Sequence, residues 1–398
     1  MTAELLILIS TILLIAYLFD LTSSKTKIPS VILLLFLGWT LKLIVSFLVQ
    51  DIPDLNPLLP LLGTIGLIMI VLEGTMDLEI NSQNLPLLKK GFSIAFLSFL
   101  LLLVLFSSIL VFWLGVDLRL ALINSVPFCI VSSSIAISSV RNWEKSLKTI
   151  VIYESTLSDI IGIMVFNFLL LNNNFQASTF LHFGYELVLV VVLSILASLL
   201  IVVILGKLRH HVKYGPILLM IILLYSFAKL YHLPGLIFIV VFGLLLGNIQ
   251  EFQWFKRFEM LKSEHFVREI EPFKDIVNEA TFLLRSLFFI LFGFLIKTEE
   301  LFDLESLKTA LIIVGAIVFL RFVVIKTLKI RVFPLLFISP RGLITILLFY
   351  SIPQYFQLAN IKNALVLQVI VISVLIMVLS EFFKSKEWPQ RLMNRQDF

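Results

Sequence analysis

Long apolar runs follow one another along almost the whole chain, separated only by short charged or Pro/Gly/Asn-rich breaks. A helix needs roughly 20 apolar residues to cross a bilayer, and most of these runs approach that length. Of the 398 residues, 60% are apolar and only 14% are charged, against about a quarter charged in soluble domains. A soluble fold is therefore excluded, and the pattern predicts an all-α polytopic membrane protein.

Cutting the chain at its breaks gives about thirteen membrane spans. We place them at residues 3–19, 29–49, 57–77, 91–114, 118–140, 148–172, 178–206, 214–231, 233–248, 274–296, 307–326, 332–351 and 362–383. An odd number of spans puts the two termini on opposite sides of the membrane. Only a short polar segment follows the last span, so no cytosolic regulatory domain is expected.

Lys and Arg residues in the breaks indicate the orientation, because cytoplasmic loops carry the excess of positive charge. One set of alternate loops and the tail hold most of them: Lys25, Lys27, Lys89, Lys90, Arg141, Lys145, Lys148, Lys207, Arg209, Lys213, Lys256, Arg257, Lys262, Arg268, Lys326, Lys329, Arg331, Lys384, Lys386, Arg391 and Arg395. The other loops hold Arg119, Lys229, Lys297, Lys308 and Lys362. We expect an integral protein of the plasma membrane with its N-terminus outside and its C-terminus in the cytoplasm.

Two spans do not read as continuous helices. The span at 118–140 contains Pro127 and then a run of serines, and the span at 332–351 contains Ser339-Pro340-Arg341-Gly342 in its middle. An ordinary proline kink explains the first span alone, but interrupted helices at matching places in two halves are typical of a transporter binding site near the bilayer midplane. If the first and last six spans are inverted repeats joined by the linker at 178–206, the two interrupted spans should cross.

Other classes of function have little support. Cys129 is the single cysteine, and adjacent His210 and His211 have no further ligands nearby in the sequence, so neither a disulfide nor a zinc site is expected. No glycine-rich phosphate loop is present. The net charge of +5 resides in short loops, which fits membrane orientation better than nucleic-acid binding. We expect no cofactor.

Ionisable side chains inside a bilayer cost about 2.5–3.5 kcal/mol each on insertion scales, so each needs a partner, a water-filled cavity or a function. The deep ones are Glu154, Asp159, Arg285, Arg321 and Arg341, with Glu73 nearer the cytoplasmic end of its span. Lys42 also lies within a run, where its long stem suits it to reach an interface. Arg285 either pairs with Glu279 or lines a funnel.

The segment Glu154-Ser155-Thr156-Leu157-Ser158-Asp159 holds two carboxylates on different stripes of one helix, because residues advance about 100° each. Ser155 shares the stripe of Asp159, and Ser158 that of Glu154. A carboxylate among hydroxyls and backbone carbonyls suits a small dehydrated cation, and it equally binds a proton. That competition is the minimal chemistry of a cation/proton exchanger. The alternative is that Asp159 only pairs with a buried arginine.

Four motifs give the chain a family resemblance over nearly its full length. Leu72-Glu73-Gly74 with Asp77 and Leu78 resembles the pattern LEG…DL. Glu154-Ser155 followed by Ser158-Asp159 resembles ES…ND. The other two are Phe288-Phe289 with Gly293, similar to FFxxxG, and Pro340-Arg341-Gly342-Leu343, similar to the RG motif of the second broken helix. In their order and placement these resemble the monovalent cation/proton antiporter superfamily, the sodium/proton exchangers.

The resemblance implies a role for each matching residue. Asp159 would bind the proton and the metal ion (Na⁺, K⁺ or Li⁺) in turn, with hydroxyls from Ser155, Ser158 and Ser133 as candidate ligands. Glu154 would pair structurally with Arg321. Arg341, with Ser132 and Ser134 beside it, would support the crossing of the broken helices through their carbonyl ends. Glu73 would line a cytoplasmic funnel.

The resemblance also implies how the chain works as a transporter. A core at about 91–172 and 307–383 would move against a scaffold at about 1–77 and 214–296 by alternating access, with 178–206 as a linker helix. The scaffold would also form a homodimer.

Two positions depart from the family pattern. Ser158 stands where electroneutral members carry Asn, and Ser132-Ser133-Ser134 stand where many carry Asp. The serine run is closer to potassium-efflux relatives, so K⁺/H⁺ exchange stays open beside Na⁺/H⁺ exchange. A cation channel is the alternative of a different class, although no filter sequence is visible.

The stoichiometry follows from the number of groups that can titrate. Since arginine stays protonated, Arg321 leaves Asp159 as the one titrating group, which predicts one-for-one electroneutral exchange.

Overall fold

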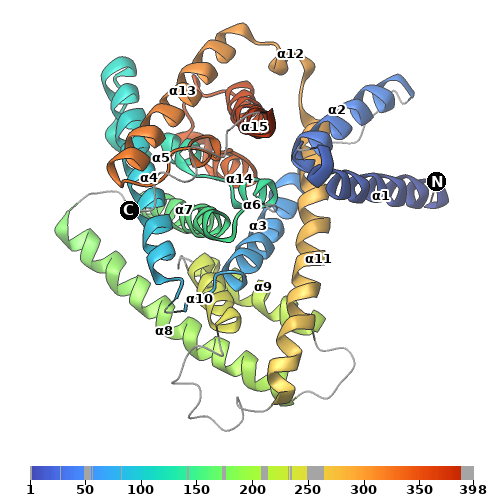
Figure 1. The fold of residues 1–398 in the computed structure, drawn as a ribbon, viewed down its shortest axis with the longest axis vertical. Coiled ribbons are helices and arrows are strands. Elements are labelled where there is room, and N and C mark those ends of the chain that lie inside the picture. The colour runs from blue at the N-terminus through green and yellow to red at the C-terminus, as the bar shows by residue number, and fades with distance from the viewer. Residues whose placement is uncertain are drawn as a thin grey trace.

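The structure is a computed structural model that describes residues 2–26, 28–48, 55, 57–81, 83–140, 143–172, 176–207, 214–231, 233, 235–248 and 264–386. These residues form helices joined by short connections, with no strand among them (Figure 1). The helices are α1 (Thr2–Thr26), α2 (Ser30–Leu48), α3 (Leu58–Met76), α4 (Leu85–Leu114), α5 (Leu118–Cys129), α6 (Ser133–Ser139), α7 (Lys145–Leu171), α8 (Ala177–Lys207), α9 (Tyr214–Leu230), α10 (Gly235–Gly247), α11 (Glu264–Leu295), α12 (Thr298–Leu301), α13 (Leu304–Thr327), η3 (Leu335–Phe337), α14 (Leu343–Ser351), η4 (Gln354–Phe356) and α15 (Asn363–Lys386).

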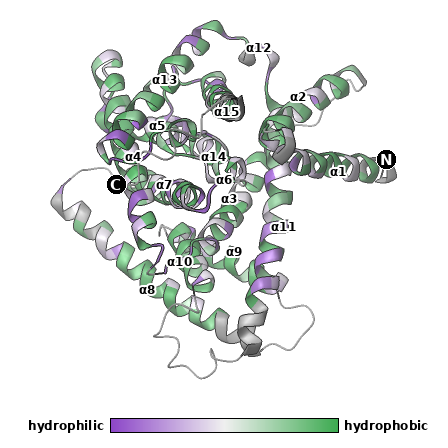
Figure 2. Ribbon diagram, viewed as in Figure 1, coloured by the Kyte–Doolittle hydropathy of each residue, from purple (hydrophilic) through white to green (hydrophobic). Residues whose placement is uncertain are grey.

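The membrane spans predicted from the sequence all have counterparts, so the polytopic helical fold is confirmed. Within the described ranges, nine segments are long and apolar enough to cross a bilayer, and three apolar helices are shorter. Apolar residues cover most of the peripheral helices (Figure 2). Lys27, Arg141 and Arg209, like several other loop residues used to predict orientation, lie outside the described residues, as do His210 and His211.

Helix boundaries differ from the expected spans where a helix continues beyond the apolar layer. The span expected from residue 274 belongs to α11, which begins at Glu264 and carries Pro272 within it. Polar positions alternate with apolar ones along the coloured lower part of α11 (Figure 2). Charged breaks in a sequence mark where a chain leaves the hydrocarbon, whereas a helix ends where its backbone hydrogen bonds end. The two boundaries therefore need not coincide.

The helices pack in two groups that meet at α3. In the first group α2 and α3 pack against α11, and α10 packs against α3 and α8. In the second group α4 packs against α5, α7 and α13, and α13 packs against α15. Because α3 also contacts α7 and α14, it forms much of the boundary between the groups (Figure 1).

Two interrupted helices cross in the second group. The first consists of α5 and α6, which are separated by the non-helical residues 130–132, and the second consists of η3 and α14, separated by residues 338–342. The backbone N–H of Ser132 donates to the carbonyl of Pro340 at 2.8 Å. Each interruption therefore satisfies a backbone group of the other, as non-helical backbone inside a membrane protein requires.

Candidate functional site

The carboxylate of Glu154, on α7, is bound on both oxygens by one guanidinium. Arg321 of α13 donates from Nη2 to Oε2 at 2.9 Å and from Nη1 to Oε1. Its Nε donates to the carbonyl of Leu335 at 3.0 Å. Both side chains are almost fully buried, with 1% and 2% of their surface exposed. This bidentate pair ties α7, α13 and η3 together, and the guanidinium neutralises the charge of Glu154.

Asp159 lies in a different environment, further along the same helix. Its side chain is 3% exposed, and Ser133 lies against the carboxyl group, which its backbone N–H and hydroxyl face. Its Oδ1 has no hydrogen-bond partner. Among the ion pairs of the described residues, none includes Asp159. The alternative in which Asp159 only neutralises an arginine is therefore not what the structure contains.

The serines expected around Asp159 fall into two groups. Ser133, at the start of α6, contacts the carboxyl group, and Ser155 lies one turn before Asp159 with its hydroxyl donating to the carbonyl of Val151 at 2.8 Å. That bond leaves the oxygen lone pairs of Ser155 available. Ser158 instead accepts the N–H of Val131 at 3.0 Å, so it holds the interruption between α5 and α6. Ser132 and Ser134 share a hydrogen bond at 3.1 Å.

Arg341 sits fully buried beside the crossing of the two broken helices. Its Nε donates to the carbonyl of Phe128 at 2.9 Å and its Nη1 to that of Ser339 at 2.7 Å, while its backbone N–H donates to Ser373 at 3.0 Å. Two backbone carbonyls at the interruptions thus accept hydrogen bonds from this guanidinium. The first of these is near the C-terminal end of α5, where a cation is favourable.

The crossing requires a glycine at position 342 because no room is left there for a side chain. A Cβ atom on residue 342 would lie 2.6 Å from the hydroxyl oxygen of Ser132 and 3.0 Å from its Cβ. Any larger residue would push the two interruptions apart. The Arg-Gly pair thus combines a cation for the carbonyls with a residue small enough for the backbones to meet.

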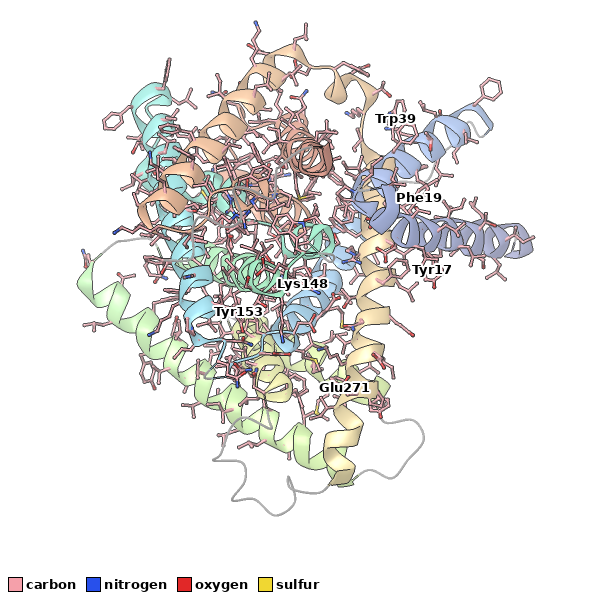
Figure 3. The ribbon with its side chains drawn as sticks, in the orientation of Figure 1. Tyr17, Phe19, Trp39, Lys148, Tyr153 and Glu271 are labelled. Atoms are coloured by element: carbon pink, nitrogen blue, oxygen red, sulfur yellow. The ribbon has the colours of Figure 1, made fainter. Side chains whose placement is uncertain are left out.

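A polar cavity of about 330 Å³ reaches Ser133 from one side of the molecule. It is lined by Asp20, Ser23, Ile70, Glu73, Gly74, Asp77, Ser133, Ser134, Ile137, Ser138, Lys148 and Arg285. Lys148, labelled in Figure 3, lies on α7 close to α6 and α3. Asp77 also forms a 2.6 Å salt bridge with Lys274 of α11. The cavity thus reaches Ser133, the residue that lies against the carboxyl group of Asp159. Glu73 and Arg285 both line it.

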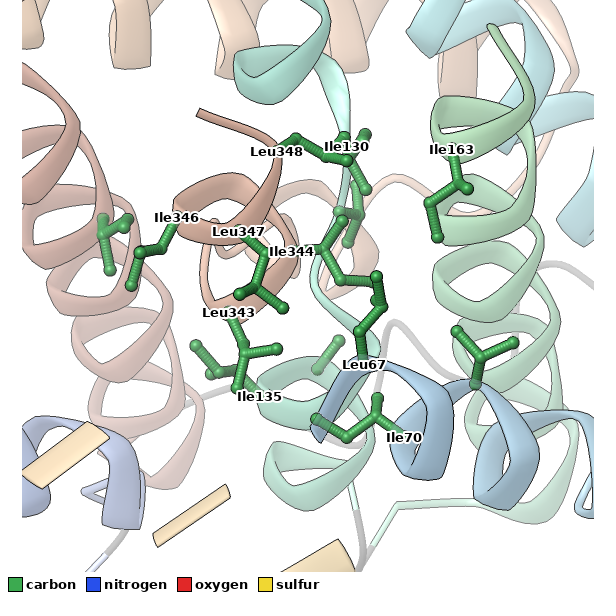
Figure 4. Close-up of a cluster of buried hydrophobic side chains, with 14 of the residues drawn as sticks. Leu67, Ile70, Ile130, Ile135, Ile163, Leu343, Ile344, Ile346, Leu347 and Leu348 are labelled. Carbon is green, nitrogen blue, oxygen red and sulfur yellow. The ribbon is translucent and has the colours of Figure 1, made fainter. Parts of the chain in front are cut away.

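Buried apolar side chains pack beside this site, between α3 and the broken helices. Leu67 and Ile70 of α3 lie near Ile130, Ile135 and the α14 residues shown in Figure 4. Leu347 of α14 packs directly on Gly63 of α3, where a Cβ atom would overlap it. Gly63, Leu67 and Leu347 also line a second cavity of about 270 Å³, so the apolar packing between α3 and α14 borders an open space.

Some residues of the site cannot be recognised from the sequence. Asp20 lies at the end of an ordinary apolar helix, and Ser373 is one hydroxyl in the last span. Neither belongs to a motif: Asp20 lines the cavity with residues of α3, α6, α7 and α11, and Ser373 accepts the N–H of Arg341. Only the packing of α1 and α15 brings them to the cavity and to Arg341.

Comparisons with known proteins agree with this geometry. The family model "Sodium/hydrogen exchanger, transmembrane" matches residues 9–383. A sequence search of curated proteins finds no match. The structure is similar to that of the sodium proton antiporter MjNhaP1 from Methanocaldococcus jannaschii at pH 8, with a TM-score of 0.69 and 19% identity over 98% of this chain and 100% of that one. An electron-microscopy structure of MjNhaP1 gives the same values.

The solved structures support the fold, and the family model supports the kind of protein. The match covers nearly the whole chain, including both broken helices and the two carboxylates of α7. The resemblance inferred from the four motifs is thereby confirmed, and the chain is a membrane transporter rather than an enzyme. It belongs to the sodium/hydrogen exchanger family.

Proposed function

We propose that the protein exchanges a monovalent cation, Na⁺ in the first place, for H⁺ at the carboxyl group of Asp159. The observation that carries this proposal is the state of that group: it is buried, it has no basic partner among the described residues, and one oxygen has no hydrogen bond. A bare carboxylate in such a place is unfavourable unless a proton or a cation binds to it. The two ligands therefore compete for one group.

The side chains around Asp159 indicate which groups would bind the cation together with its carboxylate. Hydroxyl oxygens of Ser133 and Ser155 would complete a hard oxygen site for a small cation. Glu154 takes no part in the exchange because Arg321 occupies both of its oxygens. One titrating group then carries one proton or one cation, so exchange is one-for-one and electroneutral.

Alternating access would follow from the packing of the two helix groups. The first cavity gives the site access from one side, and Leu347 packs on Gly63 at the boundary between the groups. We propose that the core at about 91–172 and 307–383 moves against the scaffold at about 1–77 and 214–296, with α8 as the linker. A homodimer through the scaffold, a plasma-membrane location and an N-terminus outside belong to the same proposal.

K⁺/H⁺ exchange is the second candidate. The observation that favours it is the serine run of α6, which provides hydroxyls rather than a second carboxylate beside Asp159. A site with less negative charge compensates less of the dehydration cost of a small ion. That cost is larger for Na⁺ than for K⁺, so the charge of the site bears directly on the choice between them.

Coupled flux in proteoliposomes tests the proposal. We expect an imposed Na⁺ gradient to drive proton movement in the opposite direction, and an imposed pH gradient to drive Na⁺. Repeating the assay with Li⁺, K⁺ and Rb⁺ ranks the cations, and protein-free liposomes are the control. Cation flux without coupled proton flux would indicate a channel, and a stronger response to K⁺ than to Na⁺ would favour the second candidate.

A further inference from the structure

Thr156, one turn before Asp159 on α7, holds a hydroxyl group that no other described residue satisfies. Its side chain is 3% exposed, and its Oγ1 has no hydrogen-bond partner. Hydroxyls inside helices ordinarily donate to the carbonyl four residues earlier, and that of the neighbouring Ser155 does so, to Val151 at 2.8 Å. A buried polar group without a partner is unfavourable, so the exception at Thr156 requires an explanation.

The position of Thr156 relates its hydroxyl to the transport site. Residues three apart on a helix are neighbours on its surface, so Thr156 and Asp159 share a face of α7. Gly74 of α3 lies against Thr156: a Cβ atom on residue 74 would be 3.5 Å from Oγ1. Gly74 also lines the polar cavity. The hydroxyl thus lies directly behind the cavity wall.

The carboxyl group of Asp159 also lies directly behind the wall of this cavity, at a point next to the one behind which Thr156 lies. Ser133 lines the cavity and contacts the carboxyl of Asp159, whose Oδ1 has no partner either. Within the described part of α7, Thr156 Oγ1 and Asp159 Oδ1 are the two buried side-chain oxygens without a hydrogen bond. They lie on one face, next to two adjacent sections of the same cavity wall.

We propose that Thr156 is a further ligand of the transported cation, its hydroxyl oxygen binding the ion together with Asp159 Oδ1. This inference rests on the proposed function. A neutral hydroxyl replaces one water of the hydration shell without adding charge, and its oxygen is a hard donor suited to Na⁺ or Li⁺. It therefore strengthens cation binding and leaves the number of titrating groups unchanged.

A packing role for the side chain gives a different expectation. The methyl group of Thr156 lies 3.4 Å from the Cβ position of residue 74, which is ordinary contact. Valine has nearly the same shape and keeps that contact, but it lacks the hydroxyl. If Thr156 only fills space, Thr156→Val leaves cation binding unchanged.

The experiment compares Thr156→Val and Thr156→Ser with the wild type in the liposome assay, using Na⁺, Li⁺ and K⁺ separately. We expect Thr156→Val to raise the apparent KM for Na⁺ roughly 10-fold, since a lost hydrogen-bond-strength contact is of that size. Thr156→Ser should stay within about threefold of the wild type, because it retains the oxygen. Ser98→Ala is the matched control, because the Ser98 hydroxyl on α4 is also buried without a partner.

The outcomes separate this inference from the proposed function. A wild type without cation-coupled proton flux overturns the proposed function itself. A coupled wild type with an unchanged KM in Thr156→Val overturns only the role of Thr156, as does an equal change in Ser98→Ala. If Thr156→Val does not fold, Thr156→Cys takes its place: soft sulfur is a poor ligand for Na⁺, so the same rise in KM is expected, and its absence overturns the inference.

Discussion

The two carboxylates of α7 are almost equally buried, yet their surroundings are opposite. Glu154 is 1% exposed and Asp159 is 3% exposed. Both oxygens of Glu154 accept from Arg321, whereas Asp159 contacts Ser133 and keeps Oδ1 without a partner. Burial alone therefore does not distinguish a structural acid from a transporting one. The partner decides, because the charge of a carboxylate held by a guanidinium is already neutralised, so a proton or a cation gains less by binding to it.

The largest effect should come from removing the acid that has no basic partner. We expect Asp159→Asn to fold but to lose exchange by at least about 100-fold, because the amide cannot alternate between a proton and a cation. The measurement is Na⁺-driven proton flux in liposomes, with the melting temperature as a check on folding. Asp117→Asn, at the N-cap of α5, is the matched control and should exchange normally. Normal coupled flux from Asp159→Asn would remove Asp159 from the mechanism.

Removing the paired acid should affect stability instead. Glu154→Gln leaves the buried Arg321 without its counter-charge, at a cost of about 3–5 kcal/mol in the free energy of unfolding. The effect is measured as a lower melting temperature and lower yield of folded protein.

The double variant Glu154→Arg with Arg321→Glu should recover part of that loss, because it restores opposite charges at the same two positions. A stable Glu154→Gln protein whose only change is its cation preference would show that Glu154 is a ligand. The division between the two acids would then be wrong.

A smaller effect is expected at the serine that supports the crossing. Ser158→Ala removes the acceptor of the Val131 N–H and leaves that buried donor unsatisfied, at a cost of about 1–3 kcal/mol in the free energy of unfolding. Ser139→Ala, near the end of α6, is the control, because the Ser139 hydroxyl only donates to the carbonyl of Ala136. Equal melting temperatures for the two variants would contradict a supporting role for Ser158.

The last prediction is that the membrane voltage has no effect on the ion gradients at which flux reverses. If Asp159 alone alternates between proton and cation, the voltage across the membrane should not move the ion gradients at which flux reverses. The measurement sets the voltage with an ionophore and an ion that the protein does not carry. Each net charge moved would be worth about 2.3 kcal/mol per 100 mV. A reversal point that moves with voltage would therefore reveal a second titrating group.

How much could be predicted from the sequence differs between the spans and the site. The spans, the two interruptions and the segment from Glu154 to Asp159 are local patterns, and each is visible within about one helix. The family resemblance implies that Arg341 binds carbonyl ends of the broken helices, but it does not say which ones, and those of Phe128 and Ser339 were not predictable. Backbone carbonyls leave no trace in a sequence.

The cavity is also beyond local patterns. It draws its lining from α1, α3, α6, α7 and α11, and which residues of those helices face it depends on how the helices rotate against one another. Thr156 illustrates this point: the sequence places it beside Ser155, but its unpaired hydroxyl depends on Gly74 of another helix.

The sequence by itself determined that this chain spans the membrane many times as helices, because a lipid environment forces each segment to satisfy its own backbone hydrogen bonds. It also determined where that rule is broken, at the serines after Cys129 and at Pro340. Only the tertiary structure decided how the breaks are compensated: the N–H of Ser132 donates to the carbonyl of Pro340, and Arg341 donates to carbonyls of both interruptions. It also left Asp159 without a basic partner among the described residues. These contacts join residues far apart in the chain, so their geometry exists only after the helices have packed.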